Sequence, residues 1–262
     1  MDDTLYDVGT GFTAHRNSDG ATSFMVEKLN FPDTASAKVV RDEYFARYHS
    51  TAKGLLVAEK EGKLPPPPSG WPEGKPIFDP QDLSEWWAEN LDFSLLRGPY
   101  RDLADMLTSC PLNLVAFSNG PRKYVLRVLK ELGLDGVFPE DKVFAVNDVL
   151  PSCKPEKEAF EKVFKAIGVE HASECVMVED SMKNTRIAKS LGMTTVLVAG
   201  LGRRKSNMGK SENICVDVKS QSLADDAEAT KQGDAPDEDD PAVDVCIESA
   251  IDMKKVLPEL WK

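Results

Sequence analysis

The sequence lacks a long apolar run, a paired-cysteine pattern and an excess of basic residues. No stretch of about 18 apolar residues occurs, so we expect no membrane-spanning helix. The cysteines are odd in number, far apart and without a C-x-x-C pair: Cys110, Cys153, Cys175, Cys215 and Cys246. This spacing argues against a disulfide framework or a zinc site, and it favours reduced thiols in a cytoplasmic protein.

The chain is acidic overall, with a net charge of -12 and a pI of about 4.8. A surface of this charge argues against general binding to nucleic acid or to anionic membranes, although a local basic pocket can still bind a small phosphorylated ligand. The first residues, Met1 to Thr4, are acidic, so no secretory or transit peptide is expected to begin here. The 262 residues suffice for one large domain, or for a core domain with a smaller cap.

Strands and helices are expected to alternate after Leu103. The apolar runs predict strands at 112–117, 143–146, 175–178, 194–198 and 243–247. Helices are predicted to begin near Pro121, Pro155 and Ser181, and glycines follow each of them as stop signals. This alternation predicts an α/β fold with a doubly wound parallel sheet, whose ligand binds at the carboxyl ends of the strands.

Residues 9–98 are expected to be helical with irregular connections. Asp33 is a plausible N-cap, and it precedes a helix in which Val40, Tyr44, Phe45 and Tyr48 share one face. A second helical stretch includes Trp86, Trp87 and Leu91, and we attribute its aromatic stripe to packing between helices rather than to a ligand site. The proline run at 65–68 breaks any helix and forms a stiff connector.

A later segment, about 203–241, differs in composition. Between Asp225 and Asp240 it holds eight acidic residues and one lysine, Lys231, with no aromatic residue. Such a stretch cannot bury enough apolar surface to fold, so we expect a disordered acidic loop. Because a predicted strand follows at 243–247, this loop is an insertion within the domain.

Polar residues at four places are expected to meet at one edge of the sheet. They are Asp2 to Tyr6, Ser118-Asn119, Lys154-Pro155 and Glu179-Asp180-Ser181. Taken singly, each place has an ordinary explanation, such as a helix N-cap or a solvated lysine. Together they offer carboxylates for a divalent cation, hydroxyl and N–H donors for phosphate oxygens, and an ammonium group. This combination is what phosphoryl transfer requires.

The same residues resemble the four motifs of the haloacid dehalogenase superfamily. Thr4-Leu5 match the end of its D-x-D-x-T/V-L/V motif, and Ser118, Lys154 and Glu179-Asp180 match the other three. Four stretches resemble the pyrimidine 5'-nucleotidase branch more narrowly: 44–48, 118–123, 153–155 and 179–184. The resemblance implies a Rossmann-like core formed by 1–8 and 99–262, with an inserted helical cap formed by 9–98.

The resemblance also implies a role for each matching residue. The catalytic residues would be Asp2, as general acid and base, and Lys154, which neutralises charge. Substrate phosphate would be held by Ser118 and Asn119, with Thr4 supporting the loop. The cofactor would be Mg²⁺, bound by the backbone carbonyl of Asp2, by Asp180 and by the nearby Glu179. The family's nucleophilic aspartate would immediately precede Met1, together with its strand, so we expect the 262-residue chain to be inactive.

The function implied is that of a Mg²⁺-dependent phosphomonoesterase that forms an aspartyl-phosphate and acts on nucleoside 5'-monophosphates. One alternative is a non-catalytic protein that binds phosphate without the nucleophile. Another is a phosphatase of the same superfamily for a different small phosphorylated metabolite. A dehalogenase is disfavoured, because dehalogenases need no metal and the fourth motif here is acidic. Neither nucleic acid nor a membrane is expected as a partner.

Overall fold

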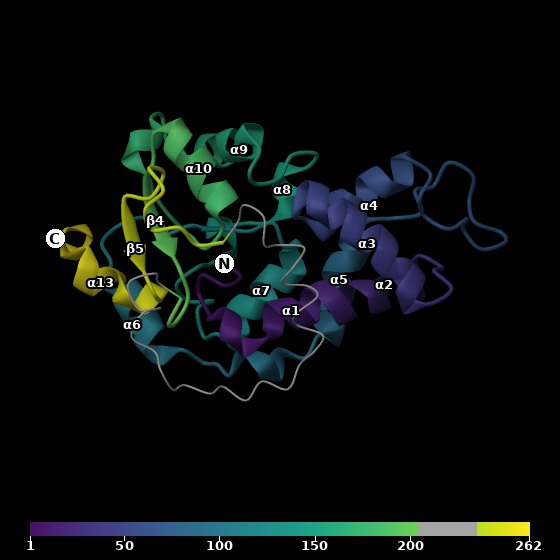
Figure 1. Cartoon of the computed structure of the whole chain (residues 1–262), viewed down its shortest axis with the longest axis horizontal. Helices are drawn as coiled ribbons and strands as arrows, with labels where there is room; N and C mark the ends of the chain where they lie inside the picture. The colour runs from purple at the N-terminus through teal and green to yellow at the C-terminus, as the bar shows by residue number, and fades with distance from the viewer. Residues whose placement is uncertain (204–234) are drawn as a thin grey trace.

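Short parallel strands lie among many helices in the computed structural model, which describes residues 1–203 and 235–262 (Figure 1). The protein is therefore an α/β protein, and it is mostly helical. Its strands form a pair, β1 (Ala116–Phe117) with β2 (Val143–Phe144), and a three-stranded sheet ordered β3 (Val176–Glu179), β4 (Thr194–Val198) and β5 (Val245–Ile247). All three ladders are parallel.

Residues 9–98 contain helices and no strand, as expected. The elements from Val8 onward are η1 (Val8–Thr10), α1 (Phe12–His15), η2 (Arg16–Gly20), α2 (Ala21–Lys28), α3 (Thr34–Tyr48), α4 (Thr51–Lys60), α5 (Pro80–Asn90) and η3 (Phe93–Leu96). The side chain of Asp33 accepts a hydrogen bond from the Ser36 N–H, which confirms it as the N-cap of α3. Helices α2 to α5 gather on the right of Figure 1, and β4 and β5 lie on the left.

The remaining described helices surround the strands. They are α6 (Arg101–Thr108), α7 (Arg122–Glu131), η4 (Glu140–Lys142), α8 (Val146–Val149), α9 (Lys157–Ile167), η5 (Ala172–Glu174), α10 (Met182–Leu191), η6 (Ala250–Asp252), α13 (Met253–Val256) and η7 (Pro258–Trp261). Helix α9 ends at Gly168, which has a φ of 73°, and α10 ends at Gly192, which has a φ of 100°. These left-handed conformations favour glycine, so both predicted stop signals are confirmed.

Several strands are shorter than the apolar runs suggested. The run at 112–117 forms a strand only at Ala116–Phe117, and the run at 143–146 only at Val143–Phe144. An apolar run reports burial, whereas a strand also requires a hydrogen-bonding neighbour. The run at 194–198 forms β4 over its full length, because this strand has neighbours on both sides.

The expected continuous sheet is divided into two small sheets. Within the described residues, β1 pairs only with β2, and β3 pairs only with β4. The first three residues of β3 are only partly buried, whereas β4 is buried from Thr195 to Val198. The two sheets nevertheless share one hydrophobic core, which also contains Met1 and residues from the helical segment 9–98.

Most of the predicted acidic loop, residues 204–234, lies outside the described part of the chain. Its last residues are described, and Asp240 accepts a hydrogen bond at 3.0 Å from Nε of Arg186 on α10. Asp240 therefore contacts the domain, although we expected the loop to extend through it. Over the described ranges, no helix has the length and apolar character needed to cross a bilayer.

Candidate active site

The polar residues predicted at the strand ends line one cavity of about 430 Å³. The residues that line it include Asp2, Ser118, Asn119, Lys154, Glu179 and Asp180. Residues of α3 and of the turn that follows it line the same cavity. Thr4 does not line the cavity; it is buried behind Asp2 and Asp180. The structure thus brings together the predicted residues, with Thr4 in a supporting position.

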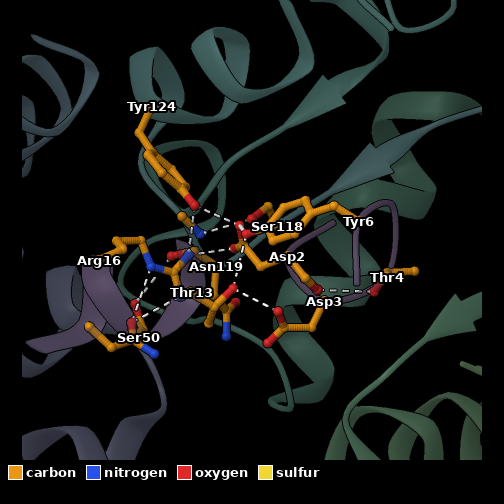
Figure 2. Close-up of polar contacts among 12 residues, drawn as sticks. Asp2, Asp3, Thr4, Tyr6, Thr13, Arg16, Ser50, Ser118, Asn119 and Tyr124 are labelled. Atoms are coloured by element: carbon orange, nitrogen blue, oxygen red, sulfur yellow. Dashed lines mark hydrogen bonds and ion pairs between the residues drawn. The ribbon is translucent and has the colours of Figure 1, made fainter. Parts of the chain in front are cut away.

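The carboxylate of Asp2 is held by three buried side chains (Figure 2). Its Oδ1 accepts hydrogen bonds from the hydroxyls of Tyr6 at 2.8 Å and Tyr124 at 2.6 Å. Its Oδ2 lies 2.5 Å from Nη1 of Arg16. Tyr124 belongs to α7 and Arg16 to η2, so Asp2 joins the core to the helical segment.

This network controls the charge of Asp2. Burial alone would raise the pKa of its carboxyl group, but the Arg16 guanidinium, the Met1 amino group and the two tyrosine hydroxyls bring the pKa below its usual value. The same contact raises the pKa of Arg16, against the effect of burial. In this arrangement Asp2 is an ionised carboxylate.

Thr4 links Asp2 to Asp180. Its hydroxyl lies 3.2 Å from the backbone oxygen of Asp2 and 2.8 Å from Oδ1 of Asp180. Burial and the nearby charges of Glu179 and Asp3 raise the pKa of Asp180 well above its usual value. Burial also raises the pKa of Asp3 to about 6, although a hydrogen bond from Thr13 opposes this. Negative charge is therefore crowded beside Asp180.

Lys154 joins the ends of β1 and β3. Its Nζ donates to the backbone oxygen of Phe117 at 3.0 Å and to Oε2 of Glu179 at 2.6 Å. Burial would raise the pKa of Glu179, but the Lys154 ammonium lowers it to about 2. Both side chains are almost fully buried, so they form an ion pair inside the protein.

Asn119 fixes the position of Lys154 through two backbone contacts. Its Nδ2 donates to the Lys154 oxygen at 2.8 Å, and its Oδ1 accepts the Lys154 N–H at 2.9 Å. The hydroxyl oxygen of Ser118 accepts the Gly120 N–H at 3.0 Å, which leaves the hydroxyl proton for another acceptor. Ser118 can therefore donate to a phosphate oxygen, while the Asn119 side chain holds the neighbouring loop.

The oxygen donors beside Thr4 suit a magnesium ion. Over the described residues, no three His, Cys, Asp or Glu side chains surround a common metal position. The smaller set here consists of the Asp180 carboxylate and the Asp2 backbone oxygen, both within reach of one hydroxyl. Magnesium commonly takes only one or two carboxylates and keeps several waters. A cation would also relieve the charge crowding that raises the pKa of Asp180.

The sequence did not reveal the residues that hold Asp2. Tyr6 and Arg16 follow Asp2 closely in the chain, but Tyr124 is 122 positions away. One signal was present: a tyrosine on the buried face of α7 needs a partner for its hydroxyl. The sequence does not say which partner it finds.

Comparisons with known proteins identify a family and similar folds. Residues 1–192 match the haloacid dehalogenase-like hydrolase family. L-2-haloacid dehalogenase from Xanthobacter autotrophicus, with chloropropionic acid covalently bound, has a similar structure: the match has a TM-score of 0.54 and 19% identity, covering 97% of this chain and 94% of that one. A HAD phosphatase from Thermococcus onnurineus matches with a TM-score of 0.52 and 19% identity, over 98% of this chain and 94% of that one.

At such low identities these structures show a shared fold alone. One is a dehalogenase and the other a phosphatase, so structural similarity does not select between the two reactions. The family match, over residues 1–192, includes Ser118, Lys154 and Asp180. The chain belongs to the haloacid dehalogenase-like hydrolase family.

Proposed function

We propose that this protein is a Mg²⁺-dependent phosphomonoesterase of the pyrimidine 5'-nucleotidase-like branch, acting on nucleoside 5'-monophosphates. The observation that carries the proposal is the convergence of Ser118, Lys154 and Asp180 on the cavity that Asp2 also lines. A hydroxyl, an ammonium and a crowded carboxylate suit the charge distribution of a transferring phosphoryl group. The helical segment 9–98 would act as the cap that closes this cavity.

Each residue has a defined task in the proposed reaction. Ser118 would bind a phosphate oxygen, and Lys154 has one N–H beyond its two protein contacts to offer the phosphate. Asp2 is ionised in this arrangement, so it would first have to take up a proton. It would then pass that proton to the leaving oxygen and afterwards activate the water that cleaves the aspartyl-phosphate. Magnesium, held by Asp180 and the Asp2 carbonyl with Glu179 nearby, would offset the charge of the phosphate.

The nucleophile would be a carboxylate in the position directly before Met1. Within residues 1–262 no carboxylate stands two positions ahead of Asp2, so we propose that this chain binds phosphomonoesters without turning them over. This property alone would also fit a non-catalytic phosphate-binding protein. Adding a carboxylate directly before Met1 distinguishes the phosphomonoesterase from the non-catalytic phosphate-binding protein.

The experiment adds an apolar strand ending in Asp directly before Met1, and uses the same extension ending in Asn as a matched control. Hydrolysis of an aryl phosphate, UMP and CMP is measured with Mg²⁺ and with EDTA. We expect turnover only with the Asp extension and Mg²⁺, and a loss of orders of magnitude in Lys154→Ala and Asp180→Ala.

Other outcomes would change the assignment. If the Asp-extended chain folds, binds Mg²⁺ and hydrolyses no phosphomonoester in a broad panel, the phosphatase assignment is wrong and the binding-protein alternative replaces it. Hydrolysis of a sugar phosphate in preference to UMP would favour the alternative of another small metabolite.

A further inference from the structure

One face of helix α3 lines the same cavity as the proposed phosphate site. The lining residues of this helix and its C-cap recur at intervals of three or four: Lys38, Arg41, Asp42, Phe45, Ala46 and His49. Residues with this spacing share one face of an α-helix. The helix therefore presents a defined set of side chains to whatever part of the substrate extends beyond the phosphate.

Phe45 is exceptional within this set, because its ring is not packed in the protein's apolar core. The neighbouring Tyr44 is buried at 1% exposure, whereas Phe45 is half-buried and belongs to none of the hydrophobic clusters formed by the described residues. The structure therefore does not place Phe45 in the apolar packing between helices. Its apolar surface faces the cavity instead, where burial by a ligand would be favourable.

The ring of Phe45 also has room for a stacking partner. Its aromatic neighbour in the described structure is His49, with ring centroids 5.7 Å apart and planes at 66°. A ring in this T-shaped arrangement covers at most one face of Phe45. Because Phe45 lines the cavity, the part of its ring that His49 does not cover can meet a flat group there, at the distances that aromatic pairs prefer.

Polar side chains border Phe45 along the same helix face. Asp42 pairs with Lys38 at 2.9 Å and with Nε of Arg41 at 3.0 Å. This border places hydrogen-bond donors and acceptors one turn from the phenyl ring. An aromatic surface with a polar border suits a flat group that carries polar atoms on its edge, such as a heteroaromatic ring.

We propose that Phe45 is the platform on which a planar heteroaromatic group of the substrate stacks, and that it thereby sets the preference for the leaving group. The inference rests on the proposed function, because Ser118 and Lys154 must bind the phosphate for the remainder of the ester to reach α3. The cavity volume of about 430 Å³ falls within the range of small-molecule sites, about 300–1,000 Å³. An aliphatic phosphate would leave the ring uncovered, whereas a nucleobase would cover it.

The test measures binding to the 262-residue chain by calorimetry in the presence of Mg²⁺, so that it needs no catalytic turnover. The probes are UMP, ribose 5-phosphate, which lacks the base, and inorganic phosphate. The variants are Phe45→Ala, which removes the ring, and Phe45→Tyr, which retains it. Val39→Ala is the matched control, because Val39 lies on the same helix, is 68% exposed and does not line the cavity. Circular dichroism melting confirms that each variant folds.

We expect UMP to bind more tightly than ribose 5-phosphate. Phe45→Ala should weaken UMP binding by roughly 5- to 100-fold, the effect of losing one base-stacking ring, and should leave ribose 5-phosphate within about twofold. Phe45→Tyr and Val39→Ala should leave UMP binding near that of the unaltered chain.

Phe45→Ala could instead lower the affinity for UMP and ribose 5-phosphate equally, or leave both affinities unchanged. Either result would contradict the proposed role of Phe45 but would not contradict the phosphate site. Equal affinity of the unaltered chain for these two ligands would do the same. If UMP, ribose 5-phosphate and inorganic phosphate all fail to bind, both the proposed function and the inference built on it are wrong.

Discussion

Nη1 of Arg16 lies 2.5 Å from Oδ2 of Asp2, and this largely buried ion pair joins the core to the helical segment. The guanidinium also lies over the ring of Trp87 at 5.5 Å and the ring of Tyr124 at 5.3 Å. Arg16 is thus fixed on its faces by aromatic rings and at its edge by a carboxylate. The proposed acid–base residue is therefore positioned by a side chain from η2, at the start of the helical segment.

Removing the arginine should destabilise the whole protein. Arg16→Met would leave the largely buried Asp2 carboxylate without its cationic partner, although the two tyrosine hydroxyls would remain, so we expect a cost of about 2–3 kcal/mol in the free energy of unfolding. Urea denaturation measures this loss. Arg127→Met, which removes an exposed arginine paired with Glu131, is the control and should cost no more than about 1 kcal/mol. A loss of similar size in both variants would show that the Arg16–Asp2 pair contributes no more to stability than an exposed ion pair does.

The contact between Lys53 and Glu156 should couple the helical segment to the loop that carries Lys154. Nζ of Lys53, on α4, contacts both carboxylate oxygens of Glu156, and one of these also accepts the Cys153 N–H at 2.8 Å. In a double-mutant cycle with Lys53→Met and Glu156→Gln, we expect a coupling of about 1 kcal/mol, modest because Glu156 is 40% exposed.

The exposed pair Lys157 and Glu161 on α9 provides a control cycle. Its coupling should stay below about 0.5 kcal/mol, which is usual for exposed pairs four residues apart on a helix. If the two cycles give the same coupling, Lys53 does not link the helical segment to the loop of Lys154.

Glu61 should make stability depend on pH in the acidic range. Hydrogen bonds from Arg47 and from the Tyr44 hydroxyl lower the pKa of Glu61 from 4.5 to about 2. Because the folded-state pKa is the lower one, the stabilisation is present above the unfolded pKa and is lost as the pH falls through the folded value.

The test of Glu61 compares melting temperatures across pH. Glu61→Gln should melt below the unaltered chain at pH 7, and the difference should shrink as the pH falls from about 4.5 to about 2. Glu43→Gln, on the exposed side of α3, is the control. A difference for Glu61→Gln that does not change with pH would contradict the assigned contacts.

The divided sheet predicts that an added strand stabilises the chain. We expect an apolar strand placed before Met1 to pair between β1 and β3, which have one strand neighbour each within the described residues. Burying even one large apolar side chain there should add about 2 kcal/mol to the free energy of unfolding. It should also suppress association through unpaired strand edges.

A glycine- and serine-rich extension of equal length is the control for the added strand. Thermal melting and size-exclusion chromatography compare the two proteins. If the chain without an extension is monomeric and melts at the same temperature as the strand-extended chain, the added strand does not pair between β1 and β3.

The residues at the strand ends could be predicted because their positions follow from the order of the motifs and from parallel pairing. Ser118 and Asp180 each directly follow a strand, and parallel strands bring these points together, whereas Lys154 lies in the turn before α9. Strand lengths could not be predicted in this way, because Val115 is as apolar as Ala116 but lies just outside the ladder. Pairing depends on a neighbouring strand as well as on the residue itself.

The role of Phe45 was beyond prediction for a different reason. Tyr44 and Phe45 are adjacent on α3, and their side chains point about 100° apart. Helical periodicity places both on one broad apolar face, so packing explains each equally well. Only the neighbouring elements show that Tyr44 enters the core and that Phe45 faces the cavity. The Arg16 contact with Asp2 depends on tertiary structure in the same way.

The burial of Met1 affects how the protein can be produced in the laboratory. Met1 is only 8% exposed, and its backbone oxygen accepts the Leu5 N–H at 2.9 Å, so the first residue is part of the folded core. Met1 also lines the cavity, so a flexible affinity tag fused in front of it would enter the proposed active site. A tag fused after Lys262, which is exposed, would extend directly into solvent. Purification through the carboxyl end is therefore the choice that leaves binding measurements interpretable.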